Sequence, residues 1–132
     1  MNLPANAPSW KIAKIMVYFQ KKNESANMSF AIEKSIGASI EDYERSARQL
    51  TSNLGINAHF GSIRFFTFKG LPAFKCRGRA TFDDVPARFL TITVKRDDFF
   101  YIVTCMDESN KFDSSLPEFE KIVESFKFIK QN

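Results

Sequence analysis

Residues Leu71–Met106, LPAFKCRGRATFDDVPARFLTITVKRDDFFYIVTCM, contain three strand-like runs that are separated by two aspartate-rich turns. Successive side chains of a strand point to opposite faces of its sheet. The first run therefore has one face with three cations and one apolar face, which consists of Phe74, Cys76, Gly78, Ala80 and Phe82. Asp83-Asp84 and Asp97-Asp98 favour tight turns because aspartate bonds to nearby backbone and tolerates unusual dihedral angles. The stretch predicts an antiparallel meander of three strands.

A two-residue turn at Asp97-Asp98 sets the register of the second and third strands of this meander. One face then holds Leu90, Ile92, Val94, Tyr101, Val103 and Cys105. The opposite face holds Phe100, Ile102 and Met106, and it also needs cover. The 15 phenylalanines of the chain favour a pleated, half-buried surface. We therefore predict an α+β fold, an antiparallel β-sheet meander with helices packed on both faces.

Two helices are expected around the sheet. Ser39 and Asp42 form a capping-box pattern at the start of the first helix, which Gly55 ends. Its apolar stripe consists of Ile40, Tyr43, Ala47, Leu50 and Leu54, and its outer face is expected to carry the pairs Glu41–Arg45 and Glu44–Arg48. A polar loop from Asp107 to Ser115 precedes the second helix. That helix is expected to start at Leu116-Pro117-Glu118, because proline is tolerated in a first turn.

Three further strands are predicted, over Trp10–Gln20, Met28–Lys34 and Phe60–Lys69. The last has apolar side chains on both sides, so we expect cover on both of its faces. We expect residues 1–9 to form a disordered lead-in and residues 10–132 to form a single domain. The lead-in has no signal-peptide pattern. The protein is therefore cytoplasmic if Met1 is the native start, and belongs to the bacterial envelope or periplasm if a signal peptide was removed.

The charges of the chain are unevenly distributed. The net charge is +4, but residues 61–96 hold eight Lys/Arg and two Asp/Glu, whereas residues 97–132 hold four and eight. The basic part can attract an anionic partner, although such an excess is commonly just a solvated surface. There is no run of 18 apolar residues, so no membrane span is expected.

Cys76 and Cys105 are the only cysteines, and we expect both to be buried free thiols. They lie on the first and third strands of the meander. Two strand spacings of about 4.8 Å separate their Cα atoms by about 10 Å, which exceeds the limit of roughly 7 Å for a disulfide. Both are assigned to the core side of the sheet. A redox pair would require another strand order.

No motif for catalysis, a metal or a nucleotide is present, so no cofactor and no enzymatic activity are predicted. His59, the only histidine, has no neighbouring ligands at zinc spacing, and we expect it in a solvated loop from Gly55 to Gly61. Asp83-Asp84, Asp97-Asp98 and Asp107-Glu108 are assigned to turns, because the ligand spacing of a calcium loop is missing.

Lys75, Arg77 and Arg79 are the candidate partner-binding residues. Alternate cations on one strand form a stripe with a spacing of about 7 Å, which suits phosphates or an acidic protein surface. The more ordinary interpretation is that they solubilise an exposed strand and discourage edge pairing. A nucleic-acid site would also need exposed aromatic rings, and Phe89 and Phe100 could serve, although we expect them under a helix.

Four segments resemble the PsbP/Mog/DcrB superfamily. They are the helix Ser39–Leu54, the run Lys69-Gly70-Leu71-Pro72-Ala73, the strand Tyr101–Cys105, and the ending Ile122-Val123-Glu124-Ser125-Phe126-Lys127-Phe128. The resemblance implies a PsbP-like α-β-α sandwich and non-enzymatic work. Its members act in photosystem assembly, as a Ran-binding protein, as bacterial envelope lipoproteins or as chaperones of secreted toxins. They share no catalytic residues.

These observations leave three functions open. We prefer a binding or accessory domain that recognises a protein partner, as an assembly factor or a chaperone-like protein. The alternative is a small-ligand carrier, or an enzyme, that uses a Phe-lined pocket between sheet and helices. A third and weaker alternative is binding of an anion or nucleic acid through the basic strand.

Overall fold

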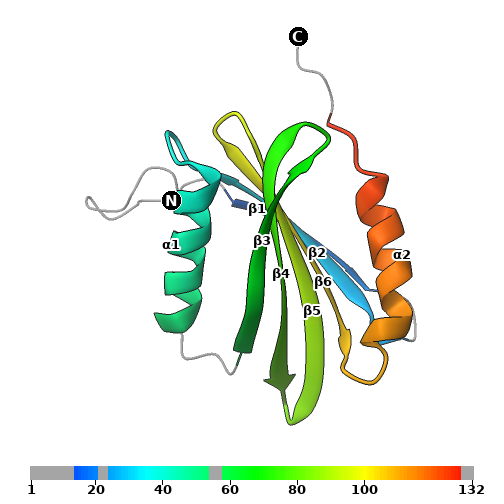
Figure 1. The fold of residues 1–132 in the computed structure, drawn as a ribbon. Coiled ribbons are helices and arrows are strands. Elements are labelled where there is room, and N and C mark those ends of the chain that lie inside the picture. The colour runs from blue at the N-terminus through cyan, green and yellow to red at the C-terminus, as the bar shows by residue number, and fades with distance from the viewer. Residues whose placement is uncertain (1–13, 21–23, 54–57, 129–132) are drawn as a thin grey trace.

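The computed structural model describes residues 14–20, 24–53 and 58–128. Its six strands and two helices follow each other in an α+β arrangement (Figure 1). In chain order they are β1 Lys14–Gln20, β2 Asn27–Lys34, α1 Ile40–Asn53, β3 Ala58–Phe68, β4 Leu71–Phe82, β5 Val85–Arg96, β6 Phe99–Glu108 and α2 Phe112–Glu124. The predicted lead-in and the predicted strand start at Trp10 lie outside the described residues.

All six strands form one antiparallel sheet with the order β1-β2-β6-β5-β4-β3. The segment that contains α1 connects β2, near one edge, to β3 at the other edge. The meander β3–β6 then returns across the sheet and pairs with β2. The helices lie on opposite sides of the sheet (Figure 1), and we call these sides the α1 face and the α2 face. The predicted meander and fold class are confirmed.

Each face of the sheet has its own core. Leu90 lies opposite Cys105 and Ile92 opposite Val103, as the turn at Asp97-Asp98 predicted. These side chains pack with Phe112, Phe119 and Val123 of α2. On the α1 face, Phe100 is fully buried and its ring stacks on Tyr43 with centroids 4.1 Å apart. The smaller core there consists of Ile40, Tyr43, Phe74 and Phe100.

The hairpin turns of the meander have left-handed backbone conformations. Asp83 and Asp84 have φ angles of 49° and 65°, and Asp97 has a φ of 55°. Lys69 and Gly70 have φ angles of 49° and 83° at the β3–β4 turn. Two-residue hairpins favour such angles because they match the twist of the strands. The first two acidic pairs are therefore turn residues, as predicted.

The capping box of α1 is confirmed, but one side of this helix differs from the prediction. The backbone N–H of Asp42 donates to Ser39 Oγ at 3.1 Å, and that of Ser39 donates to Asp42 Oδ2 at 3.4 Å. Glu44 was expected on the outer face, yet only 5% of its side chain is exposed. Glu44 lies next to Tyr43 on the side of α1 that faces the sheet. Its i,i+4 spacing from Arg48 therefore did not indicate a position on the outer face.

The second helix begins four residues earlier than predicted. It starts at Phe112, so the expected polar loop to Ser115 was too long and Pro117 lies inside the helix. Proline at this position removes the N–H that would bond to the carbonyl of Asp113. Phe112 is completely buried against the α2-face core, and this contact outweighs the lost hydrogen bond. No helix in the described ranges is long and apolar enough to cross a membrane.

Strand β3 is an edge strand, and most of its side chains are exposed, so the prediction that both of its faces are covered was wrong. Phe60 and Phe65 are 45% and 46% exposed, while Phe68 at its end is buried. His59 belongs to this strand and not to a loop, and it is exposed. Apolar side chains on both sides of a strand therefore did not imply burial here.

Candidate functional site

The predicted cations lie on the α2 face of the sheet, beyond the part that α2 covers. By strand alternation, Lys75, Arg77 and Arg79 share this face with Ala73, which belongs to its core. Helix α2 packs over β5 and β6, and Arg77 and Arg79 are exposed. Arg64 of β3 and Arg88 of β5 extend the group to the neighbouring strands. We call these five residues, Arg64, Lys75, Arg77, Arg79 and Arg88, the basic patch.

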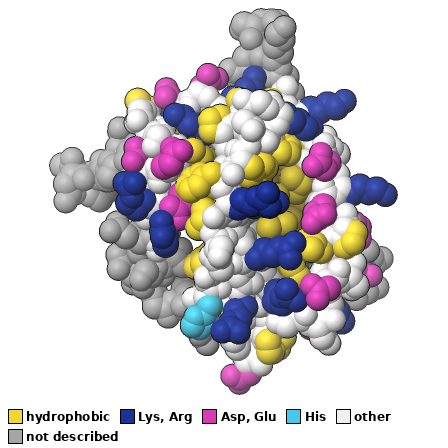
Figure 2. Space-filling model, viewed as in Figure 1, with side chains coloured by type: hydrophobic (Ala, Val, Ile, Leu, Met, Phe, Trp, Pro, Cys, Tyr) yellow, Lys and Arg dark blue, Asp and Glu magenta, His cyan; other side chains and the backbone are white. Residues whose placement is uncertain are grey.

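Cations face each other directly across the strands of the basic patch. Arg64 lies opposite Lys75, and Arg79 lies opposite Arg88. Like charges in such positions destabilise a sheet. Arg88 is compensated, because it pairs with Asp113 at 3.1 Å. Within the described ranges, no carboxylate forms an ion pair with the other four. Figure 2 shows Lys and Arg side chains in a column down the middle of this view.

The position of β4 removes one explanation for its cations. This strand pairs with β3 on one side and β5 on the other, so it is not an edge that cations must protect. The aromatic rings needed for a nucleic-acid site are also misplaced. Phe100 is completely buried and Phe89 is 6% exposed. The exposed rings of Phe60 and Phe65 lie on the opposite, α1 face.

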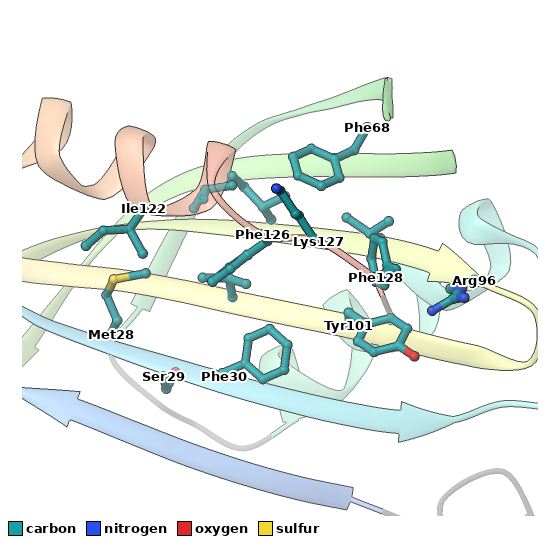
Figure 3. A pocket seen from close by; sticks show the side chains of 14 residues that line it. Met28, Ser29, Phe30, Phe68, Arg96, Tyr101, Ile122, Phe126, Lys127 and Phe128 are labelled. Atoms are coloured by element: carbon teal, nitrogen blue, oxygen red, sulfur yellow. The ribbon is translucent and has the colours of Figure 1, made fainter. Parts of the chain in front are cut away.

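An apolar cavity of about 850 Å³ lies on the α2 face between the sheet and the end of α2 (Figure 3). Its walls include the rings of Phe30, Phe68, Phe126 and Phe128. Phe30 and Phe126 meet edge to face at 5.5 Å, and Tyr101 and Phe128 do so at 4.9 Å. The structure therefore contains a Phe-lined pocket of the kind that the sequence suggested.

The chain after α2 lines one side of this cavity and is tied to the β3–β4 turn. The Lys69 ammonium donates to the carbonyl oxygen of Glu124 at 2.9 Å and also to that of Phe126. The Arg96 guanidinium lies 5.2 Å from the centre of the Phe128 ring. These contacts hold the two terminal aromatic rings over the sheet, so the pocket is a defined part of the fold.

The cysteines are free and buried, as predicted, but they lie on opposite faces of the sheet. Cys105 belongs to the α2-face core, whereas Cys76 lines a groove on the α1 face. Burial raises the pKa of Cys105 to about 12. Burial also raises the pKa of Cys76, although a hydrogen bond from the Gly61 backbone acts in the opposite direction. Both were expected on one side because the sequence did not establish the register of β4 against β5: Cys76 lies opposite Thr91, whereas Cys105 lies opposite Leu90 on the other face.

Asp107 was predicted in a turn, but it is a buried residue near the end of β6 and is 3% exposed. It accepts hydrogen bonds from Ser25 Oγ, Ser115 Oγ and the backbone N–H of Glu108. Burial raises its pKa, but these hydrogen bonds outweigh burial, so the pKa lies below its usual value. The residue joins β6 to α2 and to the segment before β2.

In the part of the chain that the structure describes, no group of three or more His, Cys, Asp or Glu side chains could hold a metal ion. The molecule is thus a six-stranded antiparallel sheet between two helices, with an apolar cavity and a basic patch on one face. Proteins that share a fold can differ in function, so the function of such a protein has to be argued from its own surfaces.

Several solved structures share this fold, among them the following three, each at 12% sequence identity. One is a protein of unknown function, PA94 from Pseudomonas aeruginosa, described as a putative regulator, with a TM-score of 0.66 over 99% of this chain and 92% of that one. Another is cyanobacterial PsbP (CyanoP) from Synechocystis sp. PCC 6803, with a TM-score of 0.63 over 86% and 82%. The third is LpqN of Mycobacterium tuberculosis, with a TM-score of 0.63 over 80% and 64%.

These similarities show that the chain has a PsbP-like fold, as the sequence resemblance implied. No protein-family model matches the sequence, and no curated protein matches it either. At 12% identity the structural similarity extends to the fold and not to individual side chains. The function must therefore be argued from the surfaces of this molecule.

Proposed function

We propose that this protein is a non-enzymatic binding or accessory domain that recognises an acidic surface of a protein partner. Lys75, Arg77 and Arg79 are the principal contact residues, and Arg64 extends the surface. In this role the protein acts as an assembly factor or in a chaperone-like way. The observation that carries the proposal is that the cations of β4, a strand that is not an edge, have no carboxylate partner among the described residues.

The electrostatics of the basic patch support this proposal. The opposed cations Arg64 and Lys75 cost the sheet stability, and an acidic partner would offset that cost when it binds. Lys75 and Arg77 project from the α2 face, which also carries the larger apolar core. A partner that covers these two cations would therefore also approach the apolar side chains at the border of that core. A patch of one sign also accelerates encounter with a partner of the opposite sign.

The structural neighbours are compatible with accessory work. One is described as a putative regulator, and LpqN is described as involved in cell envelope biogenesis. Neither description includes a reaction. They support a role in recognition or assembly, and the partner of this chain has to be found by experiment.

Charge reversal tests the basic patch. The triple variant replaces its three β4 cations by glutamate: Lys75→Glu, Arg77→Glu and Arg79→Glu. A matched control with the same change in net charge replaces exposed cations elsewhere: Arg45→Glu, Lys111→Glu and Lys121→Glu. We expect specific capture of acidic proteins to fall at least about tenfold in the first variant only, with a loss of its salt dependence. Equal capture by both variants would refute the assignment.

The apolar cavity supports a second candidate function, that of a small-ligand carrier. Its volume of about 850 Å³ is within the range of small-molecule sites, and its lining is mainly aromatic and aliphatic. Native mass spectrometry of the purified protein would reveal a retained apolar ligand. A substitution that fills the cavity, Val103→Phe, should abolish that retention. A protein that never retains an apolar ligand would argue against this function.

A further inference from the structure

A groove of about 980 Å³ lies on the α1 face of the sheet, opposite the basic patch and the apolar cavity. Helix α1 borders it with Tyr43, Glu44 and Arg48, and β3 borders it with Phe60 and Phe65. Its floor is formed by side chains of β2, β4, β5 and β6. Its size is that of a small-molecule site. The function proposed above does not use this groove.

Glu44 is the unusual residue of the groove. Its side chain is 5% exposed, and its Oε2 accepts a hydrogen bond from Arg48 Nη2 at 2.7 Å. Its Oε1 is buried and has no hydrogen-bond partner among the described residues. Buried carboxylate oxygens are almost always paired, because their desolvation is costly. A donor that reached Oε1 would therefore gain a charge-assisted hydrogen bond in a site that is already desolvated.

The groove is acidic although the protein is basic. Among its lining residues, two carboxylates, Glu33 and Glu44, face one guanidinium, that of Arg48. The Arg48 side chain is 62% exposed, so water screens much of its charge. The Glu33 carboxylate accepts a hydrogen bond from the Tyr43 hydroxyl at 2.7 Å. A cation therefore fits this site better than an anion does.

The remaining walls would suit an apolar body attached to that cation. Phe60 and Phe65 are half-exposed in the groove, and Phe74 is buried behind them. Aromatic faces attract organic cations as well as apolar groups. The floor contributes the paired hydroxyls of Thr91 and Thr104, whose oxygens are 3.3 Å apart. The groove thus offers one charged acceptor, a few hydroxyl groups and an aromatic wall.

We propose that this groove binds a small organic ammonium ion with an aromatic or alkyl body. The ammonium group donates a hydrogen bond to Glu44 Oε1, and the apolar body packs against Phe60 and Phe65. Arg48 keeps the other carboxylate oxygen paired, so Glu44 stays in position when the site is empty. The site is independent of the basic patch, which lies on the other face.

Two matched probes test the proposal, 4-phenylbutylamine and the neutral 4-phenyl-1-butanol. Titration calorimetry at neutral pH should show that the amine binds at least about tenfold more tightly than the alcohol. Glu44→Gln, which keeps the shape but removes the charge, should weaken amine binding at least about tenfold. Glu41→Gln, on the exposed side of the same helix, should leave it unchanged. Arg48→Ala, which keeps the Glu44 charge, should retain amine binding.

Amide chemical shifts identify where the probe binds. Binding in the groove should move the signals of Thr91, Thr93 and Thr104, and not those of Phe126 and Phe128 beside the apolar cavity. The thermal unfolding midpoint of Glu44→Gln should not fall, because a buried amide is cheaper than a buried charge. The proposal is overturned if the amine does not bind at about 1 mM, if the alcohol binds equally well, or if a folded Glu44→Gln variant binds the amine unchanged.

Discussion

The hydrogen bonds around Asp107 should make this carboxylate a major source of stability. Asp107→Ala removes the acceptor of three donors, namely Ser25 Oγ, Ser115 Oγ at 2.5 Å and the backbone N–H of Glu108 at 2.8 Å. Hydrogen bonds to a charged group contribute about 1.5 kcal/mol or more each, but the two serine hydroxyls are only partly buried and can turn to water. We expect the free energy of unfolding to fall by about 3 kcal/mol, a large part of a domain's stability.

The assay is equilibrium unfolding in urea, followed by circular dichroism at pH 7. A suitable control is Asp113→Ala, because this carboxylate is 78% exposed and forms a surface ion pair with Arg88. Exposed ion pairs contribute little, so the control should change stability by less than about 0.5 kcal/mol. The reasoning is wrong if Asp107→Ala costs less than about 1 kcal/mol.

The contribution of Asp107 should also depend on pH. Its pKa in the folded protein lies below the ordinary value, because hydrogen bonds to the charged form outweigh burial. The stabilisation is therefore present above the unfolded pKa, near pH 4, and is lost as the pH falls through the folded pKa. Asp107→Asn should be less stable than the wild type at pH 7, and this difference should shrink below about pH 4. A difference that stayed constant from pH 7 to pH 3 would contradict the assigned charge state.

Three further substitutions or reagents test the packing of the sheet. Gly78→Ala should lower the free energy of unfolding by about 1–3 kcal/mol in urea titrations, because its Cβ would lie 2.7 Å from the carbonyl oxygen of His59 and collide with the Phe89 ring. Phe100→Ala should cost about 3–5 kcal/mol by the same assay, since the ring is completely buried. Cys105 should react with a thiol reagent at pH 8 only after denaturation, because it is buried and its pKa is about 12; rapid reaction of the folded protein would show that the core is open.

Local patterns predicted much of the fold correctly. The alternation in Leu71–Met106 and the turn at Asp97-Asp98 determined three strands and their register, because strand side chains have a period of two. The capping box at Ser39 identified the start of α1, since its hydrogen bonds involve residues three apart. The cations of β4 were also assigned to one face by alternation alone.

The candidate sites were harder to predict, because they depend on strand order. Phe65 was expected to be covered because β3 has apolar side chains on both of its faces, but β3 lies at an edge of the sheet and Phe65 is half-exposed. Nor did it reveal that Arg64 lies beside Lys75, a pairing made by neighbouring strands of the meander. Glu44 had an exposed i,i+4 partner and was assigned to the outer face for that reason. Glu44 lies beside the sheet because α1 is oriented about its axis so that the adjacent Tyr43 is buried.

The meander at Leu71–Met106 illustrates which structural properties the local sequence determines and which depend on tertiary contacts. The sequence by itself determined that this stretch pairs as strands, where it turns and which side chains share a face, because these properties arise between near neighbours. Only the tertiary structure decided which face each helix covers, which strand forms the edge, and which charges remain without a partner. Those outcomes depend on contacts between segments far apart in the chain, such as β2 with β6, and no local pattern encodes them.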